Sequence, residues 1–115
     1  MPVIKVWCLP EQTEEELRRL HQGIVSAVVG VSELGLEDEN DMTVFFPPDM
    51  MKYGIGSEVV VEVSGLFSKP ERTPEVRNRL AEGVGRCVHA LYPNAKVECF
   101  VTVFEPWQGF WTSEQ

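Results

Sequence analysis

The sequence is short of basic residues, of cysteine and of long apolar stretches, and each shortage excludes a class of protein. It has 10 Lys and Arg residues against 18 Asp and Glu residues, so its formal net charge is -8. Nucleic acids and anionic membranes bind surfaces that carry an excess of positive charge. The charge balance therefore argues against both of them as partners.

The cysteines and the apolar runs are equally sparse. Cys8, Cys87 and Cys99 are an odd number without CxxC spacing, which indicates neither a disulfide framework nor a zinc site. No apolar run approaches the ~20 residues that a membrane-spanning helix needs, and no signal-peptide pattern opens the sequence. We expect a cytoplasmic protein that uses no cofactor.

The apolar content is sufficient for one core. In a chain of 115 residues, 43% are hydrophobic, which is ordinary for one globular unit. We therefore expect a single domain over residues 1–115.

The chain also repeats itself at a spacing of about sixty residues. Pro10-Glu11-Gln12-Thr13 recurs as Pro70-Glu71-Arg72-Thr73, and Met42-Thr43-Val44-Phe45-Phe46-Pro47 is matched by Val101-Thr102-Val103-Phe104-Glu105-Pro106. We place two pseudo-repeats at residues 2–57 and 58–115. Two differences between the copies matter for chemistry: Pro2 corresponds to Glu62, and Gln12 corresponds to Arg72.

Each repeat has the pattern of a strand, a helix and a strand. In the first repeat, residues 3–9 form a strand before Pro10, a helix begins after Thr13 with a capping box to Glu16, and residues 42–46 form a strand. The apolar stripe of this helix comprises Leu17, Leu20, Ile24, Val25 and Val28.

The second repeat has the same order. Residues 58–67 form a strand, Thr73 caps a helix with Pro74 at its first position, and residues 96–105 form the last strand. The stripe of this helix comprises Val76, Leu80, Val84, Val88 and Leu91.

Two β-α-β units in series predict an α+β fold with paired parallel strands and both helices on one face of a four-stranded sheet. Residues 59–63 and 101–104 are apolar on both sides of their strands, which indicates that the face without helices is also covered. In so short a chain the cover must be another subunit. We therefore expect a homo-oligomer.

The opening Met1-Pro2-Val3-Ile4-Lys5-Val6, the helix start Glu71-Arg72-Thr73 and the turn Tyr53-Gly54-Ile55-Gly56 resemble the tautomerase superfamily, the group of 4-oxalocrotonate tautomerase and macrophage migration inhibitory factor. Within that group the chain is similar to the long, fused type. The resemblance implies that three chains close a barrel, which makes the protein a homotrimer, and that an amino-terminal proline is catalytic.

Pro2 is the expected catalytic residue. If Met1 is removed, Pro2 becomes a secondary amine at the chain start. Burial at the start of a strand penalises the ammonium form and lowers the pKa toward the working pH of a general base. The alternative is that a proline after the initiating methionine marks nothing.

Arg72 is the expected substrate-binding cation. It directly precedes the capping Thr73, so its guanidinium and the free amides of the first helical turn could bind one anion together. The resemblance implies that this anion is a substrate carboxylate. The alternative is a surface ion pair with Glu71 or Glu75.

Two aromatic residues complete the candidate set. The resemblance implies that Tyr53 walls the pocket, although a tyrosine at a subunit boundary is the plainer interpretation. Trp107, with Phe110 and Trp111, could form a rim around the proline or anchor a subunit interface.

These residues favour a tautomerase-like enzyme that transfers a proton on a small keto or enol carboxylate. Pro2 would act as general base while Arg72 holds the carboxylate. Two alternatives remain open: a noncatalytic trimer that binds a ligand or partner, and a ferredoxin-like module that forms a dimer, because that fold shares the β-α-β-β-α-β order.

Overall fold

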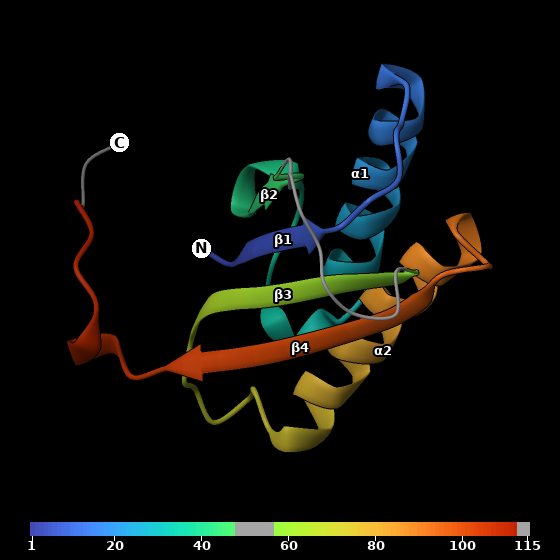
Figure 1. The fold of residues 1–115 in the computed structure, drawn as a ribbon. Helices are drawn as coiled ribbons and strands as arrows, with labels where there is room; N and C mark the ends of the chain where they lie inside the picture. Colours follow the sequence, from blue (N-terminus) through green and yellow to red (C-terminus); the bar gives the residue numbers. More distant parts are fainter. Residues whose placement is uncertain (48–56, 113–115) are drawn as a thin grey trace.

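The computed structural model describes residues 1–47 and 57–112. A four-stranded sheet carries both helices on one face (Figure 1). The elements are β1 (Val3–Trp7), α1 (Glu14–Val29), β2 (Thr43–Phe45), β3 (Glu58–Phe67), α2 (Pro74–Leu91) and β4 (Lys96–Phe104), with short 3-10 turns at Ser32–Leu34, Glu39–Asp41 and Pro106–Gln108. The predicted α+β fold is confirmed.

The strand order of the sheet is β2-β1-β3-β4. β1 is parallel to β2 and β3 is parallel to β4, whereas β1 and β3 are antiparallel at the centre. Each β-α-β unit therefore has its two strands as neighbours. The ferredoxin-like alternative is wrong, because that fold splits its β-α-β unit with an intervening strand.

The first strand is shorter than expected. β1 ends at Trp7 instead of residue 9, because Cys8 takes a backbone φ of 71°. That left-handed conformation is uncommon for a residue with a Cβ, and it cannot continue a strand.

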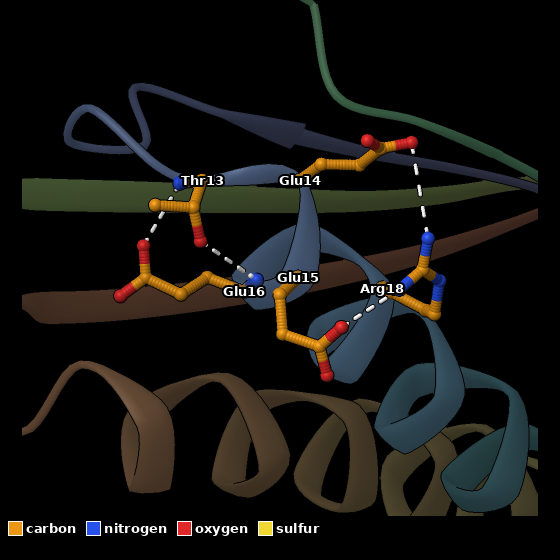
Figure 2. Close-up of polar contacts among 5 residues, drawn as sticks. All are labelled: Thr13, Glu14, Glu15, Glu16 and Arg18. Atoms are coloured by element: carbon orange, nitrogen blue, oxygen red, sulfur yellow. Dashed lines mark hydrogen bonds and ion pairs between the residues drawn. The ribbon is translucent and has the colours of Figure 1, made fainter.

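Helix α1 begins at the predicted capping box (Figure 2). The hydroxyl of Thr13 accepts a hydrogen bond from the backbone N–H of Glu16 at 3.1 Å, and the Glu16 carboxylate accepts one from the Thr13 backbone N–H at 2.8 Å. These bonds to Thr13 lower the pKa of Glu16. Arg18 lies one turn along and binds the Glu15 carboxylate at 2.7 Å. The helix start is thus specified by residues that are neighbours in sequence.

Helix α2 begins in the same way, without the reciprocal bond. The Thr73 hydroxyl accepts from the Val76 N–H at 3.2 Å, and Pro74 is the first helical residue. Proline suits this position because its missing N–H would have had no partner inside the helix.

The core lies between the helices and the sheet. Alternate residues of β1 and β3 point toward the helices, and every third or fourth residue of each helix points back. The predicted helical stripes are confirmed at their centres. The buried residues of these four elements are Ile4, Val6, Leu20, Ile24, Val28, Val59, Val61, Val63, Leu66, Val76, Leu80, Val84 and Val88. No helix in the described residues is long and apolar enough to span a membrane.

The other face of the sheet mixes charged and aromatic side chains. One cross-strand row runs from Phe45 through Lys5 and Glu62 to Phe100. The two aromatic ends of this row are about half exposed, at 50% for Phe45 and 53% for Phe100. The Trp7 indole N–H donates to Glu62 at 2.7 Å. This face therefore exposes two aromatic rings, one on each side of a charged centre.

Candidate functional site

Pro2 lies buried at the start of β1. Its carbonyl oxygen accepts a hydrogen bond from the Thr43 N–H at 3.0 Å, which ties it to the start of β2. The Thr43 hydroxyl also donates to the Met1 sulfur at 3.1 Å. The amino-terminal segment is therefore held in place by the neighbouring strand.

Gly65 of β3 makes room for this segment. The register between β3 and β4 shifts between Val63 and Leu66, and Gly65 has a φ of +78°. A Cβ at Gly65 would stand 2.7 Å from the Met1 carbonyl oxygen and 3.6 Å from the Pro2 Cα. A glycine inside a strand pattern is the usual signal of a bulge or a close backbone approach, and Gly65 has this position in β3.

The guanidinium of Arg72 is partly buried and binds backbone carbonyls. Its Nη1 donates to the carbonyl of Phe67 at 2.9 Å, and its Nη2 donates to that of Leu34 at 3.3 Å. The buried Nε has no hydrogen-bond partner in the described residues. Burial lowers the pKa of Arg72, and the charge of Glu71 opposes this effect. The side chain thus links α2, β3 and the turn that follows α1.

Pro2 and Arg72 lie at the same end of the sheet. Val3 pairs with Ser64, so Pro2 lies beside the last residues of β3. Phe67, the final residue of that strand, supplies the carbonyl that Arg72 binds. The amino terminus and the loop that leads to α2 are both at the left end of the sheet in Figure 1.

The segment after β4 leaves the sheet at this same end (Figure 1). The Trp111 ring packs 5.0 Å from the Phe67 ring, which itself meets Phe104 edge to face at 5.1 Å. Trp107 and Phe110 remain 77% and 90% exposed. Trp111 anchors the segment, whereas Trp107 and Phe110 face outward.

Comparison with known proteins rests on structure alone. No family model matches the sequence, and no curated protein matches it either. The structure aligns with the fused 4-OT protein F6, an asymmetric trimer, with a TM-score of 0.74 and 14% identity over 98% of this chain and 94% of that one.

Two further solved structures agree. Pt0534 inactivated by 2-oxo-3-pentynoate aligns with a TM-score of 0.68 and 14% identity, over 90% of this chain and 86% of that one. Macrophage migration inhibitory factor from Toxoplasma gondii aligns with the same TM-score and identity, over 97% of each chain. The chain has the tautomerase fold. The resemblance stated from the sequence is confirmed at the level of the fold.

Within the tautomerase fold of this chain, the candidate residues are only partly brought together. Pro2 and Arg72 share one end of the sheet, and Trp107 lies on the segment that leaves from that end. Tyr53 and its turn lie outside the described residues. In the described part of the chain, no group of three or more His, Cys, Asp or Glu residues could hold a metal ion.

Proposed function

We propose that the chain is a tautomerase-like enzyme in which Pro2, freed by removal of Met1, is the general base for proton transfer on a small keto or enol carboxylate. The observation that carries this proposal is the position of Pro2, buried at the end of the sheet where Arg72 also lies. The tautomerase fold supports it as analogy.

The surroundings of Pro2 suit a neutral amine. Burial penalises the ammonium form, so we expect a lowered pKa for a free Pro2 nitrogen, and the Arg72 guanidinium at the same end of the sheet acts in the same direction. A neutral secondary amine has a lone pair that can take a proton from the carbon beside a carbonyl. The resulting ammonium then returns the proton to a different atom of the same enolate, and no other reactant is consumed.

Arg72 would hold the substrate carboxylate. Of its two carbonyl contacts, the one to Leu34 is the longer at 3.3 Å, and Nε has no partner in the described residues. A carboxylate could accept from Nε and Nη2 as a bidentate pair if the side chain gave up the Leu34 contact and turned outward, because Nε is buried in its present position. The contact to Phe67 would keep the guanidinium in position.

The assembly is proposed to be a homotrimer in the cytoplasm. Phe45 and Phe100 on the helix-free face, and Phe110 after β4, are exposed large apolar residues of the kind that subunit interfaces bury. In the trimer we assign Tyr53 and Trp107 to the walls of the site. The three cysteines form no disulfide within the described residues, which suits a reducing compartment.

The first test is covalent labelling of the intact protein. Mass spectrometry first establishes whether Met1 is removed. The protein is then incubated with 2-oxo-3-pentynoate, the compound named for the inactivated Pt0534. A free amine adds to the alkyne carbon in conjugation with the ketone, and no group leaves. We expect a gain of one probe mass on the amino-terminal peptide of the wild type and much slower labelling of Pro2→Ala, whose amino terminus is a primary amine. A chain that keeps Met1, or a label that Pro2→Ala still takes up at the same rate, contradicts the proposal.

The second test is steady-state kinetics with an enol-pyruvate type substrate. Pro2→Ala should lower kcat by at least ~100-fold, the usual effect of losing a general base. Arg72→Gln should mainly raise KM, while Arg86→Gln, an arginine of α2 paired with Glu82 at the surface, should leave both constants unchanged. Equal rates for wild type and Pro2→Ala would exclude the catalytic role.

A noncatalytic trimer that binds a partner is the second candidate, favoured by the exposure of Trp107 and Phe110. Aromatic side chains this exposed are unusual on a free surface and common in binding interfaces. The solution mass of a trimer together with no labelling and no turnover by a chain that has lost Met1 would support it over the enzyme.

A further inference from the structure

A cleft lies at the end of the sheet opposite Pro2. Its volume is about 560 Å³, within the range of small-molecule sites. Its described lining comes from the end of β1, the start of β3 and the turn between α2 and β4: Cys8, Leu9, Pro10, Ser57, Glu58, Val59, Leu91, Tyr92, Pro93, Asn94 and Ala95.

The internal repeat relates this cleft to the space between Phe67 and Leu34 that the Arg72 side chain fills. Gln12 is the counterpart of Arg72, and residues 92–94 follow the second helix as residues 32–34 follow the first. The Arg72 side chain spans this space and donates to the carbonyl of Leu34. Gln12 instead folds back, and its side-chain nitrogen donates to the carbonyls of Pro10 at 3.0 Å and Glu11 at 2.8 Å. The Gln12 side chain is shorter than that of arginine, so the equivalent space in the first repeat stays unfilled.

The Tyr92 side chain extends toward Gln12 here, where the other repeat has an arginine. Its hydroxyl lies 2.7 Å from the Gln12 Oε1. Since the Gln12 nitrogen is committed to two carbonyls, Oε1 must accept and Tyr92 must donate. The lone pairs of the tyrosine oxygen are then available to a donor in the cleft. Burial raises the pKa of Tyr92, as does the charge of Glu16, so the hydroxyl keeps its proton at neutral pH.

The rim of the cleft holds the one non-glycine residue with positive φ in the described chain. Cys8 has a φ of 71°, a conformation that costs about 1–3 kcal/mol and that proteins retain most often at binding and catalytic sites. Here it turns the chain out of β1 and forms one wall of the cleft.

The described lining of the cleft includes no Lys or Arg and is mostly apolar, with Leu9, Pro10, Val59, Leu91, Pro93 and Ala95 among its residues. We propose that this cleft binds a small uncharged aromatic molecule with one O–H or N–H donor, its ring against the apolar walls and its donor on the Tyr92 oxygen. The ligand class therefore differs from the carboxylate proposed for the Pro2 site, and the two sites can be tested separately.

Binding is tested by NMR titration of the ¹⁵N-labelled full chain with phenol, toluene and benzoate. We expect phenol to cause saturable shifts in the amide signals of Tyr92, Asn94 and Ala95. Toluene should bind the same place more weakly, and benzoate should not shift these signals. The absence of saturable shifts with phenol, or equal binding of benzoate, would overturn the proposal.

Substitutions distinguish the contribution of the apolar walls to binding from that of the Tyr92 hydroxyl. Tyr92→Phe should weaken phenol binding about fivefold, the loss of one net hydrogen bond, and leave toluene unchanged. Ala95→Leu should weaken both probes by filling the cleft, whereas Pro2→Ala, at the other end of the sheet, should affect neither. If Tyr92→Phe weakens phenol and toluene equally, the hydroxyl has no part in recognition.

A dilution series tests whether a second copy of the chain covers the cleft instead. Signals of Tyr92, Asn94 and Ala95 that stay constant from high to low protein concentration support an open site for small molecules. Shifts confined to these signals on dilution would assign the cleft to a subunit interface and overturn the proposal.

Discussion

The carbonyl oxygen of Met1 lies over the backbone of Gly65, so close that a Cβ on Gly65 would stand 2.7 Å from it. The amino-terminal segment can reach its place beside β3 only because residue 65 has no side chain. The position of Pro2 therefore depends on a glycine in the other repeat, where β3 shifts its register against β4.

Gly65→Ala is expected to destabilise the protein and displace Pro2. In protein that keeps Met1, the substitution must accommodate a φ of +78° and push away the Met1 carbonyl, so its cost there should exceed the ~1 kcal/mol of a left-handed alanine alone. Gly35→Ala is the matched control, because its φ is +72° and nothing lies within 4 Å of its Cβ. Urea denaturation measures both. Equal losses of the free energy of unfolding in the two variants would show that the contact with Met1 does not affect stability.

The capping box of α1 predicts a pH dependence. The pKa of Glu16 is below its ordinary value of 4.5, mainly because the Thr13 backbone N–H binds the carboxylate. A depressed pKa in the folded state contributes stability that is present above the unfolded pKa and is lost as the pH falls through the folded one.

Glu16→Gln removes this titration and keeps a side chain that can accept from the cap. The stability of the wild type should exceed that of the variant above the ordinary pKa of 4.5, and the difference should shrink as the pH falls below that value. Free energies of unfolding across this range measure it. Curves that run parallel through the whole range would mean that the Glu16 charge does not stabilise the cap.

Local patterns explain why much of the fold could be predicted from the sequence. Thr13 and Thr73 bond to residues three positions away, and the helical stripes depend on spacings of three and four, so both can be read along the chain. The bond from Arg72 to the Leu34 carbonyl could not be read in this way, because Leu34 is 38 positions away. The close approach at Gly65 depends on distant residues in the same way, because the atoms it accommodates belong to Met1 and Pro2. The division into one domain with repeats at 2–57 and 58–115 stays a prediction.

Cys99 is expected to react slowly with alkylating reagents in the folded protein. Burial raises the pKa of its thiol to about 11, from an ordinary value of 9.0. Since the thiolate is the nucleophile, labelling by iodoacetamide near pH 8 should be about 100-fold slower than in the unfolded chain. Peptide mapping after timed labelling gives the rate, with the same protein in denaturant as reference. A folded-state rate within about threefold of that reference would contradict the shift.

The last prediction concerns Gly23 and Gly83, counterparts in the two repeats that meet different surroundings. A Cβ on Gly83 would lie at ordinary contact distance, 3.9 Å from the Ala27 carbonyl oxygen, whereas one on Gly23 would stand 2.6 Å from the Cys87 sulfur. Gly83→Ala should therefore stabilise the protein by up to about 1 kcal/mol through helix propensity. In Gly23→Ala, the steric clash with the Cys87 sulfur should cancel this gain in stability.

A double-mutant cycle tests this cause. Cys87→Ala removes the sulfur, so Gly23→Ala made in that background should be less costly than in the wild type, with a coupling of about 0.5–3 kcal/mol. Gly83→Ala should show no such coupling with Cys87→Ala. If Gly23→Ala costs the same in both backgrounds, the sulfur does not limit how closely the two helices pack, and the asymmetry between the repeats must come from the helix backbones themselves.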